Sequence, residues 1–394
     1  MRAPLPVPIN PAVLSWARNE SGYPVESIAK RLSVKPERIQ AWEAGEAPPT
    51  LRQVQALAKL LHRPLNLFFL PTPPRVAPLA AEYRRLPGVT PGQESPELRL
   101  ALRQMINRRD TAIGLIEELG EPLQDFALEA HLDEAAPVVA ARLRAALGIS
   151  VETQFAWQNE WQSWRAWRTA VEALHILVFQ FPKVDLHEVR GLSLLHFPLP
   201  VVGLNSKEQP EPKTYTLIHE VVHLMLASGK EEAPALAEHR TTEEWDALER
   251  FAESVSSHTL VPEHALAPLI SRSSTDWDLP AVKQLARRFR ISPLAMATRL
   301  RASGFMDWAT YSDWKQRWNE VIERLTARSG GFAHPVDISL GRNGRPYTKL
   351  VLEALAANRI TSVDASRHLG LKFEHFDKLK AGLTGGPSEV MAHE

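Results

Sequence analysis

The sequence predicts a mainly helical protein with a small α+β core. Apolar residues at helical spacing fill most of both halves of the chain. Three short apolar runs in the middle, at 174–181, 191–196 and 200–205, are typical of buried strands. The pentapeptide His219-Glu220-Val221-Val222-His223 follows them in an apolar run without Gly or Pro. Helices packed around a few strands are typical of an α+β core. The two histidines on an otherwise apolar helix indicate that this core contains a functional site.

Composition narrows the class of protein. The chain has 394 residues, which favours two or three domains, and at 44% hydrophobic and 23% charged it is globular. Its formal net charge is zero, so no overall field attracts nucleic acid or membranes. Cysteine is absent, which excludes disulfides and thiolate metal sites and suits a reducing cytosol. With no signal peptide and no run of about 18 apolar residues, we expect a cytoplasmic protein without a membrane partner.

The first segment, residues 1–70, is expected to be a bundle of short helices. The pattern places them at 12–19, 25–32, 36–43 and 51–61. Pro36 suits a first helical turn, and Gly45 followed by two prolines ends that helix. Nine Lys and Arg against five Asp and Glu give the segment a charge of +4.

Residues 71–150 combine a connector with a helical segment. Five prolines between 71 and 90 indicate a stiff, extended chain, and residues 96–150 have a helical pattern. Trp157, Trp161, Trp164 and Trp167 then repeat at helical spacing. They are either an aromatic binding face or the buried stripe of a helix, and we favour the stripe.

The pentapeptide lies in the third expected segment, residues 151–270, and indicates a metal site. On a helix, His219 and His223 share one face and can hold one Zn²⁺. Glu220 points off the ligand axis and can act as general base towards a water at the metal. Zinc is the expected cofactor, although two histidines and a glutamate also admit manganese.

A catalytic zinc needs a third protein ligand, and spacing alone does not choose it. Glu249 and Glu253 lie one turn apart on an expected apolar helix, so that one can bind metal while the other holds a ligand histidine. The candidates are His239 and the acids Glu231, Glu232, Glu238, Glu243, Glu244, Asp246, Glu249 and Glu253.

Residues of this segment resemble the ImmA/IrrE metallopeptidases. The resemblance rests on Asn205-Ser206, on the run 215–224, and on the run 249–256 before Leu260-Val261-Pro262. It covers about residues 170–265 and implies an α+β zincin-like metallopeptidase core. It also implies that Glu249 is the third zinc ligand. Glu253 stands where the family usually has Asn or Asp, and we expect it to hold a ligand histidine.

The N-terminal segment resembles the lambda-repressor-like (XRE) helix-turn-helix. The runs that carry the resemblance are 27–32, 38–45 and the apolar positions of 51–58. In that fold the second helix of the motif enters the major groove of duplex DNA. The resemblance implies that the DNA-contacting residues are Lys35, Glu37, Arg38 and Gln40.

Two further helical segments follow the core. Within 271–330, residues 280–305 hold six Lys and Arg and no acid, and are either a helix-turn-helix-like basic surface or a solvated face. Within 331–394, residues 347–380 form another helix-turn-helix-like pattern with Gly370 at the turn. This pattern is either a further such unit or a small C-terminal bundle.

These inferences predict a zinc-dependent regulatory endopeptidase with a DNA-binding domain. The resemblance implies cleavage of a helix-turn-helix repressor, which releases stress, phage or mobile-element genes. We expect the protein substrate to pair as an extended strand with 200–205. A homodimer is compatible with the sequence. The alternatives are a DNA-binding transcription regulator, or the antitoxin of a toxin pair, whose peptidase fold senses or binds without cleaving.

Overall fold

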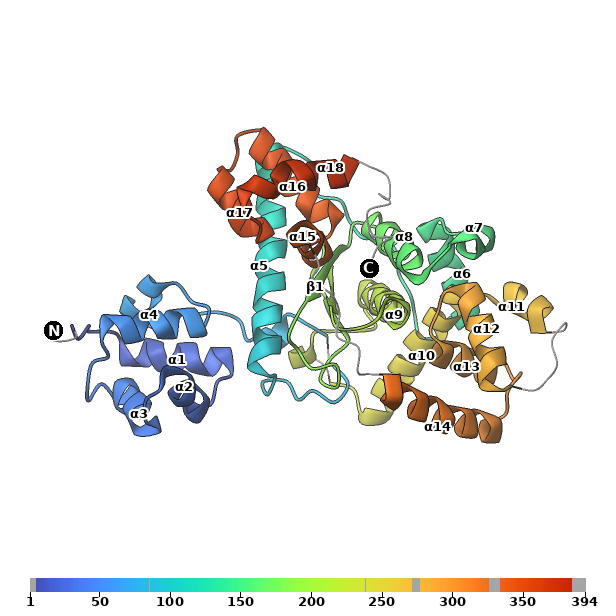
Figure 1. The fold of residues 1–394 in the computed structure, drawn as a ribbon, viewed down its shortest axis with the longest axis horizontal. Helices are drawn as coiled ribbons and strands as arrows, with labels where there is room; N and C mark the ends of the chain where they lie inside the picture. The colour runs from blue at the N-terminus through green and yellow to red at the C-terminus, as the bar shows by residue number, and fades with distance from the viewer. Residues whose placement is uncertain (1–4, 85, 238, 271–276, 326–333, 385–394) are drawn as a thin grey trace.

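The computed structural model describes residues 5–84, 86–237, 239–270, 277–325 and 334–384. Figure 1 shows a helical bundle at the N-terminal end and a small sheet in the middle. A second group of helices lies on the far side of the sheet. The predicted class, mainly helical with an α+β core, is confirmed.

The N-terminal bundle has its own hydrophobic core, built around Ile28, Ile39 and Trp42. Its helices start and end where the sequence provides caps: Thr50 and Gln53 form a capping box, and Gly45 adopts a left-handed conformation after the third helix. The elements are α1 (Pro11–Ser21), α2 (Val25–Leu32), α3 (Pro36–Ala44), α4 (Leu51–Leu60) and the 3₁₀ turn η1 (Leu65–Phe69).

The sheet has three strands in the order β1-β3-β2. They are β1 (Leu177–Phe181), β2 (Gly191–Leu194) and β3 (Val201–Asn205). β3 pairs with β1 in parallel and with β2 in antiparallel fashion. Residues 200–205 were expected to offer a free edge to a peptide, and this expectation is wrong. The chain crosses over between β1 and β3, which leaves β3 central with both of its sides paired.

Helices cover both faces of the sheet. On one face lie α9 (Pro210–Ser228) and α8 (Glu160–Glu172), in a core that includes Val178 and Val202. On the other lie α5 (Pro96–Leu119), α15 (Pro335–Asn343) and α16 (Arg345–Ala356), in a core that includes Leu177 and Phe179. Neighbouring strand residues thus point to opposite cores, as the twofold repeat of a strand requires.

The other helices complete these two layers. The 96–150 segment is not one continuous helix, because Gly120 in a left-handed conformation ends α5. Trp164 and Trp167 are buried on α8 as the stripe interpretation expects, but Trp161 of the same helix is exposed, and Trp157, although buried, precedes α8 in an extended conformation. The elements are η2 (Leu79–Ala81), α6 (Ala136–Leu147), α7 (Val151–Ala156), η3 (Ala235–Ala237), α10 (Thr242–Leu260), α11 (Glu263–Ile270), α12 (Leu279–Phe289), α13 (Pro293–Ala302), α14 (Trp308–Leu325), α17 (Ser362–Leu369), η4 (Phe373–His375) and α18 (Phe376–Thr384).

Among the described residues, no helix combines the length and apolar character needed to cross a membrane.

Candidate metal centre

The helix that carries the pentapeptide is buried against the sheet. α9 begins at Pro210, ahead of the apolar run that carries the pentapeptide, because a first helical turn accepts proline without losing a hydrogen bond. Gly191 of β2 allows the close approach: a Cβ there would lie 2.4 Å from Thr216 Cγ2 and 3.1 Å from Glu220 Cγ. The contact fixes Glu220 and the two histidines relative to the sheet.

His219, His223 and Glu249 converge on one point. The Nε2 atoms of the two histidines are 3.0 Å apart. The Glu249 carboxylate on α10 lies 3.3 Å from His219 Nε2 and 3.6 Å from His223 Nε2. Ligand atoms around a tetrahedral zinc, each about 2.0–2.1 Å from the metal, lie roughly 3.3 Å from one another. The separations in this trio therefore fit a zinc ion, and these three residues would hold it.

Glu232 orients His223. Its carboxylate lies 2.7 Å from His223 Nδ1, and both side chains are buried. When Nδ1–H donates to Glu232, Nε2 of a neutral ring directs its lone pair to the point on which the three side chains converge. Burial and Arg84 disfavour the charged ring, but Glu232 and Glu249 outweigh them and raise the pKa of His223 to about 9. A proton therefore competes with a metal ion for this nitrogen.

The supporting role expected for Glu253 falls instead to Glu232. Glu253 lies on the exposed side of α10, and its main-chain carbonyl accepts a hydrogen bond from the Tyr215 hydroxyl at 3.4 Å. Glu253 lies one helical turn from Glu249, but its side chain is exposed, whereas Glu249 is half-buried beside the histidines and Arg84. His239 is also exposed.

Glu220 is held by two groups. Its carboxylate accepts a hydrogen bond from Ser193 Oγ at 2.6 Å and two from Arg84, each at 3.1 Å. Only 2% of the Glu220 side chain is exposed. Burial alone would raise the pKa of Glu220, but Arg84 outweighs it and lowers that pKa. Glu220 is therefore an anion beside the histidine pair, as a general base requires.

Arg84, like Ser193, belongs to the site but was not predicted from the sequence. Its Nη1 also reaches Glu249 at 2.9 Å, and only 2% of its side chain is exposed. Burial would raise the pKa of Glu249, but Arg84, with hydrogen bonds from both histidines, outweighs it and lowers that pKa. Arg84 comes from the proline-rich connector, more than a hundred residues before its partners, so no local pattern identifies it.

The connector that delivers Arg84 extends the sheet. Tyr83 forms an antiparallel bridge with Leu194 of β2, and Arg84 N donates to Ser193 O at 3.1 Å. On its other side, Arg84 is bridged to Pro234, and Ala235 N donates to Tyr83 O at 2.7 Å. Residues 83–84 thus occupy the side of β2 that β3 leaves free.

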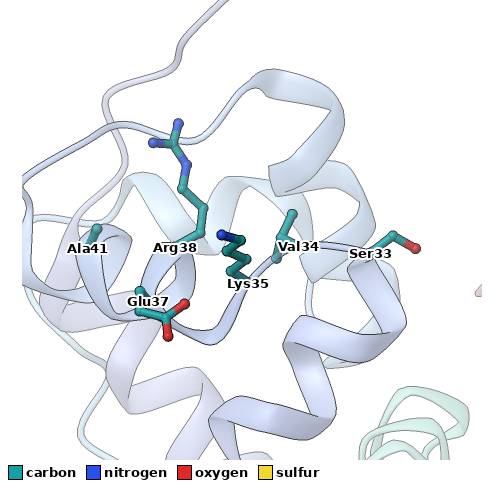
Figure 2. A pocket seen from close by; sticks show the side chains of 6 residues that line it. All are labelled: Ser33, Val34, Lys35, Glu37, Arg38 and Ala41. Carbon is teal, nitrogen blue, oxygen red and sulfur yellow. The ribbon is translucent and has the colours of Figure 1, made fainter.

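The predicted DNA-contacting residues lie together on the first turns of α3. Figure 2 shows Lys35, Glu37 and Arg38 around a hollow that Ser33, Val34 and Ala41 complete. Lys35, Glu37, Arg38 and Gln40 are all exposed. Ser33, in a left-handed conformation with φ of 55°, makes the sharp turn between α2 and α3. The arrangement leaves these side chains free to approach a groove.

Comparison with known families identifies both parts. Residues 171–301, which include β1–β3 and α9–α13, match the IrrE N-terminal-like domain, a peptidase family. Residues 14–68 match the helix-turn-helix family. No curated protein matches the chain. The class of protein is thus a DNA-binding regulator with a peptidase-family domain, and that domain is ImmA/IrrE-like.

Proposed function

We propose that this protein is a zinc-dependent endopeptidase that cleaves a protein bound to, or acting on, the same DNA as its helix-turn-helix domain. The supporting observation is the convergence of His219, His223 and Glu249 beside the buried anion Glu220. A bound zinc ion would lower the pKa of a water towards about 7 and polarise a peptide carbonyl. Glu220 would take a proton from the attacking water and return it to the leaving amine.

The substrate that this arrangement favours is a helix-turn-helix repressor, whose cleavage releases stress, phage or mobile-element genes. A DNA-binding domain in the same chain raises the local concentration of peptidase at operator DNA, where such a repressor sits. Capture with the Glu220→Gln variant tests the idea, since that variant keeps the ligands and lacks the base. We expect it to retain a DNA-binding protein that the wild type cuts. Capture of no protein that the wild type cleaves would contradict the proposal.

A second candidate function is regulation of DNA without cleavage. The observation that favours it is Arg84, which engages both the expected base and the expected third ligand. In this case the IrrE-like domain senses a metal ion or a partner, such as a toxin. A wild-type protein that binds zinc and a partner but leaves that partner intact would favour this candidate.

The N-terminal domain is expected to bind duplex DNA with strong salt dependence. About 4–6 phosphate contacts would give a log–log salt slope of roughly −4 to −5. Replacing Lys35 and Arg38 together by alanine should make the slope shallower by about 2, as measured by fluorescence anisotropy with a labelled duplex. An unchanged slope would place the DNA contacts elsewhere in the chain.

A further inference from the structure

We propose that residues 362–382 form a second DNA-binding helix-turn-helix, separate from the N-terminal domain. The first observation is a repeat in the sequence. Aligning α17 with α2 pairs Lys35 with Lys372 and Glu37 with Glu374. Three more positions are identical in the same register, and together the five pairs are Leu32 and Leu369, Lys35 and Lys372, Glu37 and Glu374, Ala44 and Ala381, and Gly45 and Gly382.

The turn between the helices is the same in both units. Gly370 and Ser33 both adopt a left-handed conformation, with φ of 60° and 55°. Leu371 N donates to Ser366 O at 3.2 Å, as Val34 N donates to Ala29 O at 3.0 Å. The next helix starts with a bond from His375 N to Lys372 O at 3.0 Å, which matches the bond from Arg38 N to Lys35 O at 3.0 Å. These hydrogen bonds set the direction of the second helix in each unit.

The buried side chains also correspond. Phe376 and Leu379 of α18 are buried where Ile39 and Trp42 of α3 are buried. Because equivalent positions of the two helices face the core, the positions that face outward are also equivalent. Lys372 corresponds to Lys35, His375 to Arg38 and Lys378 to Ala41. The Lys372 side chain is 82% exposed, and Arg367 on the preceding helix is 78% exposed.

Charge favours DNA as the partner of this face. Residues 335–384 hold eight Lys and Arg and five Asp and Glu, a net charge of +3. Residues 14–68, the matched helix-turn-helix domain, hold the same numbers. The N-terminal unit contacts α5 near its start, where Arg99 donates to Asn19 O at 2.8 Å, and α16, which precedes the C-terminal unit, packs along α5 in a shared core. Figure 1 shows the two units at different places on this helix.

The basic segment 280–305 provides a contrast. It has the same turn, with Arg290 at φ of 54° and Ile291 N bonded to Ala286 O at 3.1 Å. However, its second helix, α13, is covered: Arg299 is 1% exposed and bound to Glu263. Lys283 lies over the Trp318 ring, and Arg288 lies 4.2 Å from the centroid of Phe155. A similar turn does not by itself present a helix to DNA, whereas the Lys378 side chain of α18 is exposed even though its Nζ lies 3.1 Å from His334 Nε2.

The test uses four full-length variants and a labelled 40-base-pair duplex of mixed sequence. They are Lys372→Ala/Lys378→Ala, Lys35→Ala/Arg38→Ala, all four changes together, and the control Lys230→Ala/Lys315→Ala, which removes two exposed charges elsewhere. We expect the C-terminal pair to make the salt slope shallower by about 2. The effect should add to that of the N-terminal pair, and the control should match the wild type.

A C-terminal pair that binds like the control would overturn the proposal, whatever the N-terminal pair does. Loss of binding only in the N-terminal pair would leave the N-terminal domain as the sole DNA contact. Loss only in the C-terminal pair would support this proposal and contradict the N-terminal one. Thermal unfolding of each variant shows that the fold is retained.

A different set of contacts carries a second inference: we infer that residues 82–84 hold the metal site in a closed, autoinhibited state. An extended substrate would add to the free side of an edge strand next to the metal helix. On β2 that side is taken at Ser193 and Leu194 by Tyr83 and Arg84. The segment therefore occupies the place of a substrate strand, within its own chain.

The Arg84 side chain closes the site electrostatically. Its guanidinium sits 2.9 Å from Glu249 and 3.1 Å from Glu220, in a site that is almost fully buried. A divalent cation at the histidine pair would repel this cation and compete with it for Glu249. Binding of metal and release of Arg84 are thus coupled, and each favours the other.

Zinc affinity tests the coupling without any substrate. Arg84→Met removes the charge and keeps most of the side-chain volume, so we expect it to bind zinc at least about tenfold more tightly in a competition assay with a chelating dye. Arg84→Lys keeps a charge and should stay near the wild type. Equal or weaker binding by Arg84→Met would mean that Arg84 supports Glu249 as a ligand, and would overturn the inference.

Hydrogen exchange of the wild type provides a measurement that does not depend on the folding of a variant. We expect zinc to increase exchange in peptides that contain residues 82–84 and 193–194, because the segment leaves the edge of β2. Slower exchange in both peptides on adding zinc would show that the metal tightens this contact, which contradicts the inference.

Discussion

The Glu220→Gln variant is expected to lose proteolysis while it keeps both fold and metal. Glu220 lies beside the ligand trio but is not part of it, so the change removes no metal ligand. It removes the carboxylate that both Ser193 and Arg84 contact, and with it the group that would accept the proton. General base catalysis contributes about 10²–10⁴-fold, so the cleavage rate should fall by that factor.

The fold should survive this change because each neighbour keeps a partner. The Gln amide oxygen still accepts from Ser193, and Arg84 keeps Glu249. Glu253→Gln, on the exposed side of α10, is the matched control and should cleave like the wild type. Measuring zinc content, thermal unfolding and cleavage of a captured substrate separates the effects. A Glu220→Gln protein that cleaves at the wild-type rate would exclude Glu220 as the base.

What the sequence predicts well is local. The spacing of His219 and His223 requires only that residues 215–227 be helical, and an apolar run without helix breakers ensures it. The expected helices 25–32 and 36–43 end close to the left-handed residues Ser33 and Gly45, which is also a local effect. The family resemblance adds Glu249, which the structure places beside both histidines.

What the sequence does not predict depends on tertiary packing. Arg84 and Glu232 reach the site from a connector and from the loop after α9, and neither position carries a periodic signal. The central position of β3 depends on a crossover that strand patterns do not encode. The free edge expected at residues 200–205 and the supporting role expected for Glu253 were wrong for the same reason. Each was inferred from nearness along the chain to the metal helix or to Glu249, and not from nearness in space.

The comparison of Glu249→Ala with Glu253→Ala is expected to separate the third ligand from its neighbour. Both changes remove one carboxylate from the same helix, one turn apart, so helix propensity and net charge change equally. Glu249 lies 3.3 Å from His219 and 3.6 Å from His223, whereas the Glu253 side chain is exposed. Losing one of three protein ligands should weaken zinc binding by at least the roughly 10–100-fold typical of losing an outer-shell partner.

Metal content after dialysis, measured by mass spectrometry, gives the result directly. We expect Glu253→Ala to retain one zinc per chain and Glu249→Ala to lose most of it. Because Arg84 bonds to Glu249, the Glu249→Ala variant also removes one carboxylate partner of this guanidinium, and its positive charge then opposes a divalent ion more strongly. The two effects act in the same direction. Full retention of zinc in Glu249→Ala, with loss in Glu253→Ala, would assign the third ligand to Glu253.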